Sequence, residues 1–315
     1  MLGDIVEEMP RVYQNINGKI IDVKAEYILE DEIVKFKTGE YNKNYSLIID
    51  PWVTFVGGSS YDFAYGIDVD NNGNITTIGS TNPVLFPLTP GAFQTNYGGG
   101  SWDMFVTKFD DAGNLVFSTL MGGAGDDLGY AATSDLQGNI YITGSTTSTG
   151  LGAATTIQAT KNGNSDAIIV KFGPLGNRIW STYYGGGNAD EGCAINADAS
   201  GNIFIGGYTQ SSDLPIVPFA GYYNQPTITG GFGRDLFLTR FNSSGVLQWS
   251  TYYGTIGWEF VYPICDIDQN KNIYLFGETE DSQSLFPLYQ CAFQSTFGGD
   301  EDQFIAKFKL DGTFM

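Results

Sequence analysis

A sequence pattern that this chain repeats four times constrains its fold more than any other feature. Residues 180–209 (WSTYYGGGNADEGCAINADASGNIFIGGYT) are the clearest copy, residues 118–146 and 250–279 repeat it, and residues 54–81 are a looser copy. A second pattern, D-x-apolar-apolar-x-(K/R)-F, follows each copy and begins at Asp103, Asp166, Asp235 and Asp302. Both patterns recur about every 65 residues, which indicates one structural unit used four times.

Each unit is predicted to contain four short strands. In the third unit these are residues 179–184, 193–197, 202–208 and 235–241, which are rich in apolar, β-branched and aromatic residues. Turns such as residues 70–74 (DNNGN) supply the Gly and Asn that tight hairpins need at positive φ. The pattern predicts an all-β fold, a β-propeller of four-stranded blades, with units at about residues 52–117, 118–179, 180–248 and 249–315. Middle strands should be apolar on both faces, because neighbouring blades cover both.

Residues 1–50 do not carry the repeat and are predicted to be a small N-terminal β segment, the end of a preceding domain. Strands are expected at residues 11–14, 20–29, 32–37 and 46–49, and the propeller repeats are expected to fill residues 51–315. A segment of this size would be marginally stable alone. We therefore expect it to pack on the first blade or to continue an upstream domain.

Residues 52–56 match the strand that ends each later unit, and the chain stops where a fifth such strand would begin. This strand could therefore complete the fourth blade and close a four-bladed ring, which would remove exposed strand edges. A piece of a larger ring, cut at unit boundaries, would have the same pattern, so both alternatives stand.

Composition excludes several classes of function. The net charge of −20 argues against nucleic acid as a partner, because phosphate binding needs clustered Lys and Arg. The chain has no His, which rules out a Ser-His-Asp or Cys-His site within it. Cys193, Cys265 and Cys291 occupy non-equivalent repeat positions and are expected to be free thiols, although a Cys265–Cys291 disulfide is conceivable. No apolar run is long enough to predict a membrane span.

An acidic turn in the first unit is the strongest candidate metal site. Asp68, Asp70 and Asn72 place oxygen ligands at alternating positions before Gly73, which is how Ca²⁺ loops begin. The fourth unit has a similar set, namely Asp266, Asp268 and Asn270. The favoured alternative is a hairpin turn that the Asp and Asn side chains stabilise by hydrogen bonds to the backbone. Calcium is therefore a possible cofactor.

A second acid recurs at one position of every unit, in the set Asp62, Asp127, Asp190 and Glu259. In a propeller such residues form a ring that could hold a cation or line a channel. We favour a structural role, in which each acid accepts hydrogen bonds from backbone N–H groups or pairs with a basic residue. The recurring basic residues Lys108, Lys171, Arg240 and Lys307 are the expected counter-ions.

Long insertions between the third and fourth strands differ most among the units, so a specific binding surface is expected there. Aromatic residues in or beside these and neighbouring loops could stack on sugar rings; the candidates are Trp102, Tyr222, Tyr223, Phe232 and Trp258. The favoured alternative is that these aromatic side chains pack between blades.

The combined motif STYYGGG…DE…AINADASGNIFIGGYT, with (F/L)P(L/I)…AFQ…FGG and D-x-F-I-A-K-F, resembles the bacterial seven-bladed β-propeller repeat family over residues 52–315. Residues 18–51 are similar to the end of the domain that often precedes such repeats. The resemblance implies a secreted or cell-surface protein of several domains, with no catalytic residues. No apolar signal core follows Met1, so the protein is either cytoplasmic or a piece of a longer secreted chain, and the resemblance favours the second alternative. Four units here against seven in the family leave the blade number open.

These observations predict a non-enzymatic, extracellular or cell-surface interaction module that binds a protein or glycan through propeller loops. One alternative is a calcium-stabilised carbohydrate-binding protein. Another is a polysaccharide-active enzyme that uses carboxylates of the acid ring, which would need two acids roughly 5–9.5 Å apart in an open cleft.

Overall fold

The computed structural model describes residues 11–30, 33–50, 54–82, 85–153, 157–218, 224–229, 234–255, 259–268, 272–280, 294, 296–310, 312–313 and 315. Every regular element in these ranges is a β-strand, which confirms the predicted all-β class. The chain divides into two compact units, Met1–Val56 and Gly57–Met315.

The first unit contains five short strands. Strand β1 (Arg11–Ile16) pairs with β2 (Lys19–Asp22) and β5 (Ile48–Asp50), and β3 (Ala25–Glu30) pairs with β4 (Ile33–Thr38). The predicted single strand over residues 20–29 is wrong. The chain changes pairing partner at Val23–Lys24, where the N–H of Val23 still donates to Val12 but Lys24 accepts from Gly39.

The second unit consists of antiparallel sheets in which consecutive strands pair. The first three sheets are β6 (Asp62–Val69) to β9, β10 (Asp127–Ser134) to β13, and β14 (Asp190–Ala197) to β17. The intervening strands are β7 (Ile75–Thr81), β8 (Asp103–Phe109), β9 (Leu115–Met121), β11 (Ile140–Thr146), β12 (Asp166–Phe172), β13 (Arg178–Tyr184), β15 (Ile203–Thr209), β16 (Asp235–Phe241) and β17 (Leu247–Tyr253). A fourth sheet holds β18 (Glu259–Ile267), β19 (Asn272–Thr279) and β20 (Asp302–Lys309). These are the repeated blades of a β-propeller, as predicted.

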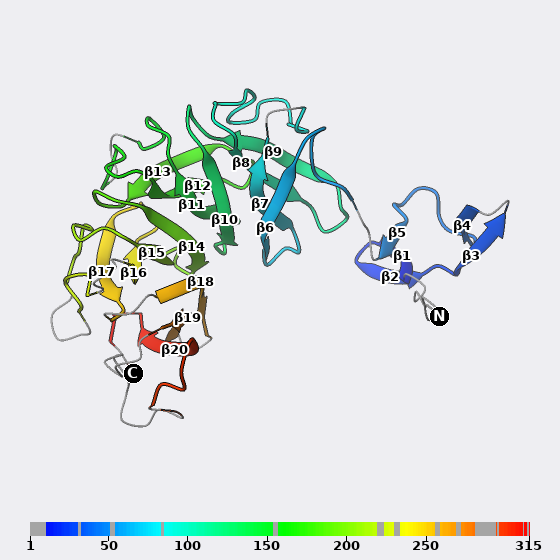
Figure 1. Cartoon of the computed structure of the whole chain (residues 1–315). Helices are drawn as coiled ribbons and strands as arrows, with labels where there is room; N and C mark the ends of the chain where they lie inside the picture. Colours follow the sequence, from blue (N-terminus) through cyan, green and yellow to red (C-terminus); the bar gives the residue numbers. More distant parts are fainter. Residues whose placement is uncertain are drawn as a thin grey trace, which may run out of the picture. The chain divides into compact units, whose positions relative to one another are not determined.

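The blades lie side by side in an arc, with β6, β10, β14 and β18 along its inner side (Figure 1). Alternate residues of each blade face its two neighbours. In the second blade, Ile140 and Ile142 pack toward Met104 of the first blade, whereas Tyr141 and Ile169 pack toward Ile205 of the third. Strands β8 and β12 are buried along their whole length. The prediction of middle strands covered on both faces is therefore confirmed.

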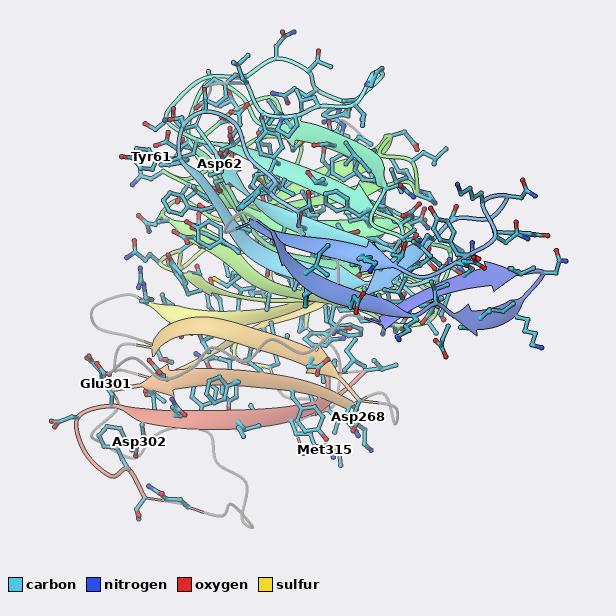
Figure 2. The ribbon with its side chains drawn as sticks, turned by 90° about the vertical axis from the view of Figure 1, so that its right-hand side faces the viewer. Tyr61, Asp62, Asp268, Glu301, Asp302 and Met315 are labelled. Carbon is cyan, nitrogen blue, oxygen red and sulfur yellow. The ribbon has the colours of Figure 1, made fainter. Side chains whose placement is uncertain are left out.

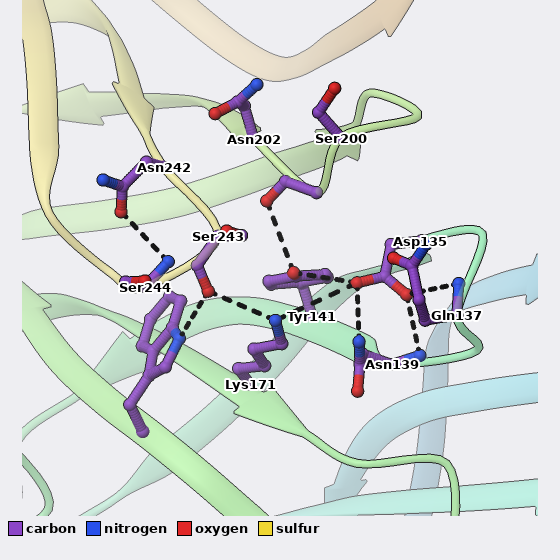
Figure 3. A network of polar contacts seen from close by, with 12 residues as sticks. Asp135, Gln137, Asn139, Tyr141, Lys171, Ser200, Asn202, Asn242, Ser243 and Ser244 are labelled. Atoms are coloured by element: carbon purple, nitrogen blue, oxygen red, sulfur yellow. Dashed lines mark hydrogen bonds and ion pairs between the residues drawn. The ribbon is translucent and has the colours of Figure 1, made fainter.

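A repeated polar contact joins the second blade to the third and the third blade to the fourth. Lys171 and the indole of Trp180 in the second blade both donate to the carbonyl oxygen of Ser243, at the tip of a third-blade hairpin, over 3.2 Å each. Figure 3 shows this hairpin opposite Lys171 and Tyr141. The hydroxyl of Tyr141 donates to Asp135. One blade further on, Arg240 and Trp249 donate to Leu310 in the same way, over 3.1 Å each. Blade order is thus set by hydrogen bonds as well as by apolar packing.

The two ends of the strands carry different sets of acids. At one end lie the acids that begin strands, such as Asp62 and Asp302, and at the other lies the hairpin residue Asp268 (Figure 2). We call the first the acidic end; it comprises Asp62, Asp103, Asp127, Asp166, Asp190, Asp235 and Asp302. The hairpin turns have the predicted glycines at positive φ, for example Gly73 at 79°.

The expected closing strand is absent from the described residues. Residues 54–56 form no strand, and the side chain of Phe55 is 98% exposed, while residues 52–53 lie outside the described part. Among the described strands, β20 pairs only with β19, and Ile305 on its outer face is 72% exposed. A strand needs a partner for its backbone groups, and residues 54–56 have none among the described strands. Ring closure and blade number remain predictions.

Candidate functional site

The recurring strand-start acids hold the turns that precede them. Asp62, Asp127 and Asp190 accept hydrogen bonds from the N–H groups of Gly58, Gly123 and Gly186, at 2.7–2.8 Å. Asp127 and Asp190 also accept from Thr and Ser hydroxyls of the neighbouring strand and the residues that follow it. The interpretation of these acids as acceptors for backbone groups is confirmed for these three, and the side chain of Glu259 lies outside the described part. Burial raises the pKa of Asp190 to about 6.

Two of the four expected counter-ions form ion pairs with other acids. For these two lysines the predicted pairing with the recurring strand-start acids is wrong. Lys108 lies 3.0 Å from Asp70, and Lys171 lies 3.9 Å from Asp135, both at the opposite end of the strands from the acid ring. The reason is register, because each lysine follows its strand-start acid by five residues along an extended strand. Arg240 donates to the next blade, and Lys307 lies over the ring of Tyr274 at 5.4 Å.

A second row of acids anchors the long loops. Asp103 accepts from the N–H of Gly98 and from Gln94, and Asp166 accepts from Asn162, Gly163 and Gln158. Gln94 and Gln158 come from the long insertions, so the loop in each blade is tied to the blade edge. Sequence analysis missed this role, although the repeated Gln a few residues before each Asp could have indicated it. Burial is also the main cause that raises the pKa of Asp103 to about 7.

The candidate calcium ligands make hairpin contacts. Asp70 accepts from the N–H groups of Asn72 and Asn74 and pairs with Lys108, and Asp68 accepts from the hydroxyl of Ser134. In the fourth unit, Asp268 accepts from Asn272 and Asp266 accepts from Asn196, while Asn270 lies outside the described part. Within the described ranges no three acidic or Cys side chains are grouped to hold a metal ion. Calcium binding remains a prediction.

Of the aromatic candidates, Trp102 is described, and Tyr222, Tyr223, Phe232 and Trp258 lie outside the described residues. Trp102 joins three aromatic residues that sequence analysis did not single out. Its ring centroid lies 5.4 Å from that of Phe63, which stacks on Tyr65 at 6.2 Å, and Tyr65 meets Tyr130 edge-on at 5.7 Å. We call Phe63, Tyr65, Trp102 and Tyr130 the aromatic cluster. Phe63 is 45% and Tyr65 is 53% exposed.

Tyr130 connects the aromatic cluster to a set of polar residues on the third blade. Burial first, and then the neighbouring carboxylate of Glu191, raise the pKa of Tyr130 and the pKa of Tyr208. The guanidinium of Arg234 lies over the ring of Tyr208, 4.1 Å from its centroid. We call Glu191, Tyr208 and Arg234 the polar cluster. Cys193 lies two residues beyond Glu191 as a free thiol whose pKa burial raises to about 12.

Phe63 and Trp102 of the aromatic cluster occupy the same repeat positions as Glu191 and Arg234 of the polar cluster. Three positions are compared in each blade. They are the residue after the acid that begins the first strand, the residue paired with it on the second strand, and the residue before the acid that begins the third strand. The first blade has Phe63, Ser80 and Trp102, the second has Leu128, Ser145 and Ser165, and the third has Glu191, Tyr208 and Arg234. The surrounding acids and glycines repeat, so these inner positions at the acidic end vary while their framework does not. Variation on a fixed framework is typical of a binding surface.

Comparison with known proteins agrees with the repeat architecture. The model of the family described as "Beta-propeller repeat" matches residues 52–86 and 179–215. The model described as "Domain of unknown function (DUF7948)" matches residues 1–52. None of the described elements is a helix long and apolar enough to cross a membrane.

Two curated proteins are similar over much of the chain. "Regulatory protein FlaEY" of Caulobacter vibrioides is 23% identical over 61% of this chain and 19% of its own length. "Uncharacterized WD repeat-containing protein L264" of Acanthamoeba polyphaga mimivirus is 21% identical over 65% of this chain and 17% of its own length. The chain thus spans about a fifth of the length of these curated relatives.

Among solved structures, "Phage phi92 endosialidase" is similar over 96% of this chain and 48% of its own, at 12% identity and a TM-score of 0.43. A likeness at this level carries no argument about fold or function. The architecture rests instead on the four sheets and the matched repeats. This chain therefore carries β-propeller repeats, preceded by a segment that matches a domain of unknown function.

Proposed function

We propose that this chain is a non-catalytic interaction module for a protein or glycan ligand, and that its contact surface is the inner side of the arc at the acidic end. The observation that carries this proposal is the aromatic cluster, which keeps Phe63 and Tyr65 about half exposed to solvent. Large amphipathic aromatic side chains are enriched where proteins bind partners.

The exposure of the aromatic cluster does not follow simply from its place in the first blade. The equivalent residues Tyr130 and Cys193 belong to blades with neighbours on both sides, and both are only half-buried. The inner side of the arc therefore reaches solvent in all three blades for which these side chains are described. A ligand can contact this surface along several blades.

Three features support a binding role over catalysis. The acids of the acidic end are occupied by backbone N–H groups and hydroxyls, as in Asp127 and Asp190. The thiol of Cys193 has a pKa of about 12, so it stays protonated and is a poor nucleophile at neutral pH. The chain also has no His to act as a general base.

The proposal includes a location at the bacterial cell surface or in the secreted fraction, within a longer chain and a larger propeller of up to seven blades. The resemblance of the repeats supports it, and the greater length of both curated relatives agrees with a longer chain. Fractionation of cells that express the full-length protein tests the location; recovery in the cytoplasm alone would contradict it.

Binding without turnover is tested with the whole chain on immobilised probes. One set of probes is a panel of polysaccharides and the other is a peptide array. We expect at least one probe to be retained by the wild type and lost by Tyr65→Ala, with no products released. Equal retention of every probe by both proteins, or release of cleaved probe, would overturn the proposal. Phe55→Ala, which removes an exposed aromatic ring elsewhere, is the matched control.

A further inference from the structure

We propose that the ligand is a neutral saccharide chain, bound along the inner side of the arc from the aromatic cluster to the polar cluster. This inference rests on the proposed function and assigns its ligand class. It follows from three properties of the two clusters, namely ring exposure, hydrogen-bonding capacity and charge.

The aromatic cluster offers ring faces of the kind that pyranose rings cover. Phe63 and Tyr65 are stacked with an interplanar angle of 29°, and Trp102 is inclined to Phe63 by 56°. Stacked and inclined rings present two neighbouring apolar surfaces, and about half of the area of Phe63 and of Tyr65 reaches solvent. The C–H faces of successive sugar units can lie on these surfaces, which buries apolar area without a charge.

The polar cluster offers acceptors and donors for sugar hydroxyls. The Glu191 carboxylate lies beside Tyr130 and Tyr208, and a carboxylate has about four acceptor positions that hydroxyl groups can use. The guanidinium carbon of Arg234 lies 4.1 Å from the ring centroid of Tyr208, and the Arg234 side chain is half-buried. A guanidinium that is fixed in this way can donate to a hydroxyl with little loss of side-chain entropy.

Continuity between the clusters defines a path rather than two separate patches. The rings of Tyr130 and Tyr65 meet edge-on, and Tyr130 also lies beside the carboxylate of Glu191. Sugar units that stack on the first blade would therefore be followed by units that hydrogen-bond on the third. A linear chain of several units fits this arrangement better than a single sugar.

Charge selects a neutral saccharide. Glu191 and Arg234 carry one charge of each sign, so the polar cluster itself has no net charge. The chain as a whole carries a net charge of −20. A polyanionic saccharide would be repelled by this field, whereas hydroxyl groups are not.

The experiment measures binding of the whole chain to neutral oligosaccharides of about six units by calorimetry. The probes are the gluco-, manno-, xylo- and N-acetylglucosamine series, with alginate and polygalacturonate as polyanions. We expect one neutral series to bind, and Tyr65→Ala and Trp102→Ala to weaken binding at least about tenfold. Glu191→Gln should weaken binding about fivefold, because the amide keeps one acceptor, and Phe55→Ala should have no effect.

Each result has a defined meaning. Trp102→Ala removes a partly buried ring, so the melting curve of this variant is measured too. If Trp102→Ala unfolds, Tyr65→Ala, which changes a more exposed residue, decides the test. Binding of the polyanions alone, or neutral binding that both aromatic variants leave unchanged, overturns the saccharide assignment. If no saccharide binds but a peptide probe is lost in Tyr65→Ala, the saccharide assignment fails and the proposed interaction function stands. If no probe of either kind depends on Tyr65, both fail.

Discussion

Asp103 should make the fold less stable as pH rises, and Asp103→Asn should remove that effect. The carboxyl is fully buried, and one of its oxygens accepts from Gly98 and Gln94 while Oδ1 has no hydrogen-bond partner in the described structure. Burial is the first cause of its raised pKa of about 7, and the charge of Asp127 adds to it. An asparagine can keep the accepting oxygen in place and put its neutral NH₂ group where Oδ1 lies.

The sign and size follow from linkage. Between the unfolded pKa near 3.8 and the folded pKa of about 7, the folded state holds a proton that the unfolded state has lost. The free energy of unfolding therefore falls as pH rises through this window and is lowest above it. Three pKa units correspond to about 4 kcal/mol, and relaxation of protein and solvent reduces this to about 2 kcal/mol.

The assay is urea unfolding of the wild type and Asp103→Asn at pH 5 and pH 8. We expect an advantage for the variant of about 2 kcal/mol at pH 8 and of less than about 1 kcal/mol at pH 5, which lies in the lower part of the window. Asp110→Asn is the control, because that hairpin carboxyl is only half-buried and its pKa is lowered, mainly by hydrogen bonds from Asn114. A variant that is equally destabilised at both pH values would refute the reasoning.

Three further predictions concern the framework. Lys108→Met should lower the free energy of unfolding by about 3 kcal/mol, because it leaves the buried Asp70 without its cation. Lys37→Met, which breaks an exposed ion pair, should lower it by less than about 0.5 kcal/mol. Equal losses for the two variants in urea unfolding would contradict this prediction. Gly144→Ala should lower the free energy of unfolding by at least about 2 kcal/mol, since a methyl group there would lie 1.8 Å from the carbonyl oxygen of Leu128. Gly187→Ala is the control, because a methyl group has room at that position. Similar melting temperatures for the two variants would contradict this prediction. Chelation of Ca²⁺ should shift the melting temperature by less than about 1 °C, because Lys108 and the hairpin amides already engage Asp70; a larger fall that added Ca²⁺ reverses would establish the calcium-stabilised alternative.

The blades could be predicted from sequence because strand period, turn residues and repeat spacing all specify the same unit. The hairpin glycines are an example, since Gly73 and Gly138 have the positive φ that their turns require. Pairing partners were harder to predict. Residues 20–29 have one continuous strand pattern, yet β2 pairs with the preceding strand β1 and β3 pairs with the following strand β4, and the pattern does not mark the break between these two hairpins.

The candidate site was only partly predictable for a similar reason. Trp102 was selected as a loop aromatic, but the rings that accompany it, Phe63 and Tyr65, lie on a strand that a β-bulge distorts between Ala64 and Gly66. A bulge shifts the alternation of side chains, so the exposed face could not be derived from period alone. The assignment of lysines to the acid ring failed because charge pairing was inferred without the strand register that places Lys108 beside Asp70.

Hydrogen exchange of the whole chain, with and without the neutral oligosaccharide that binds best, tests the central claim most directly. The account predicts slower exchange in β6, β10 and β14 near the acidic end, because the ligand lies along these inner strands. The long insertions on the outer side should exchange at unchanged rates. Protection confined to those insertions, or to the hairpins at the opposite end of the strands, would contradict the account.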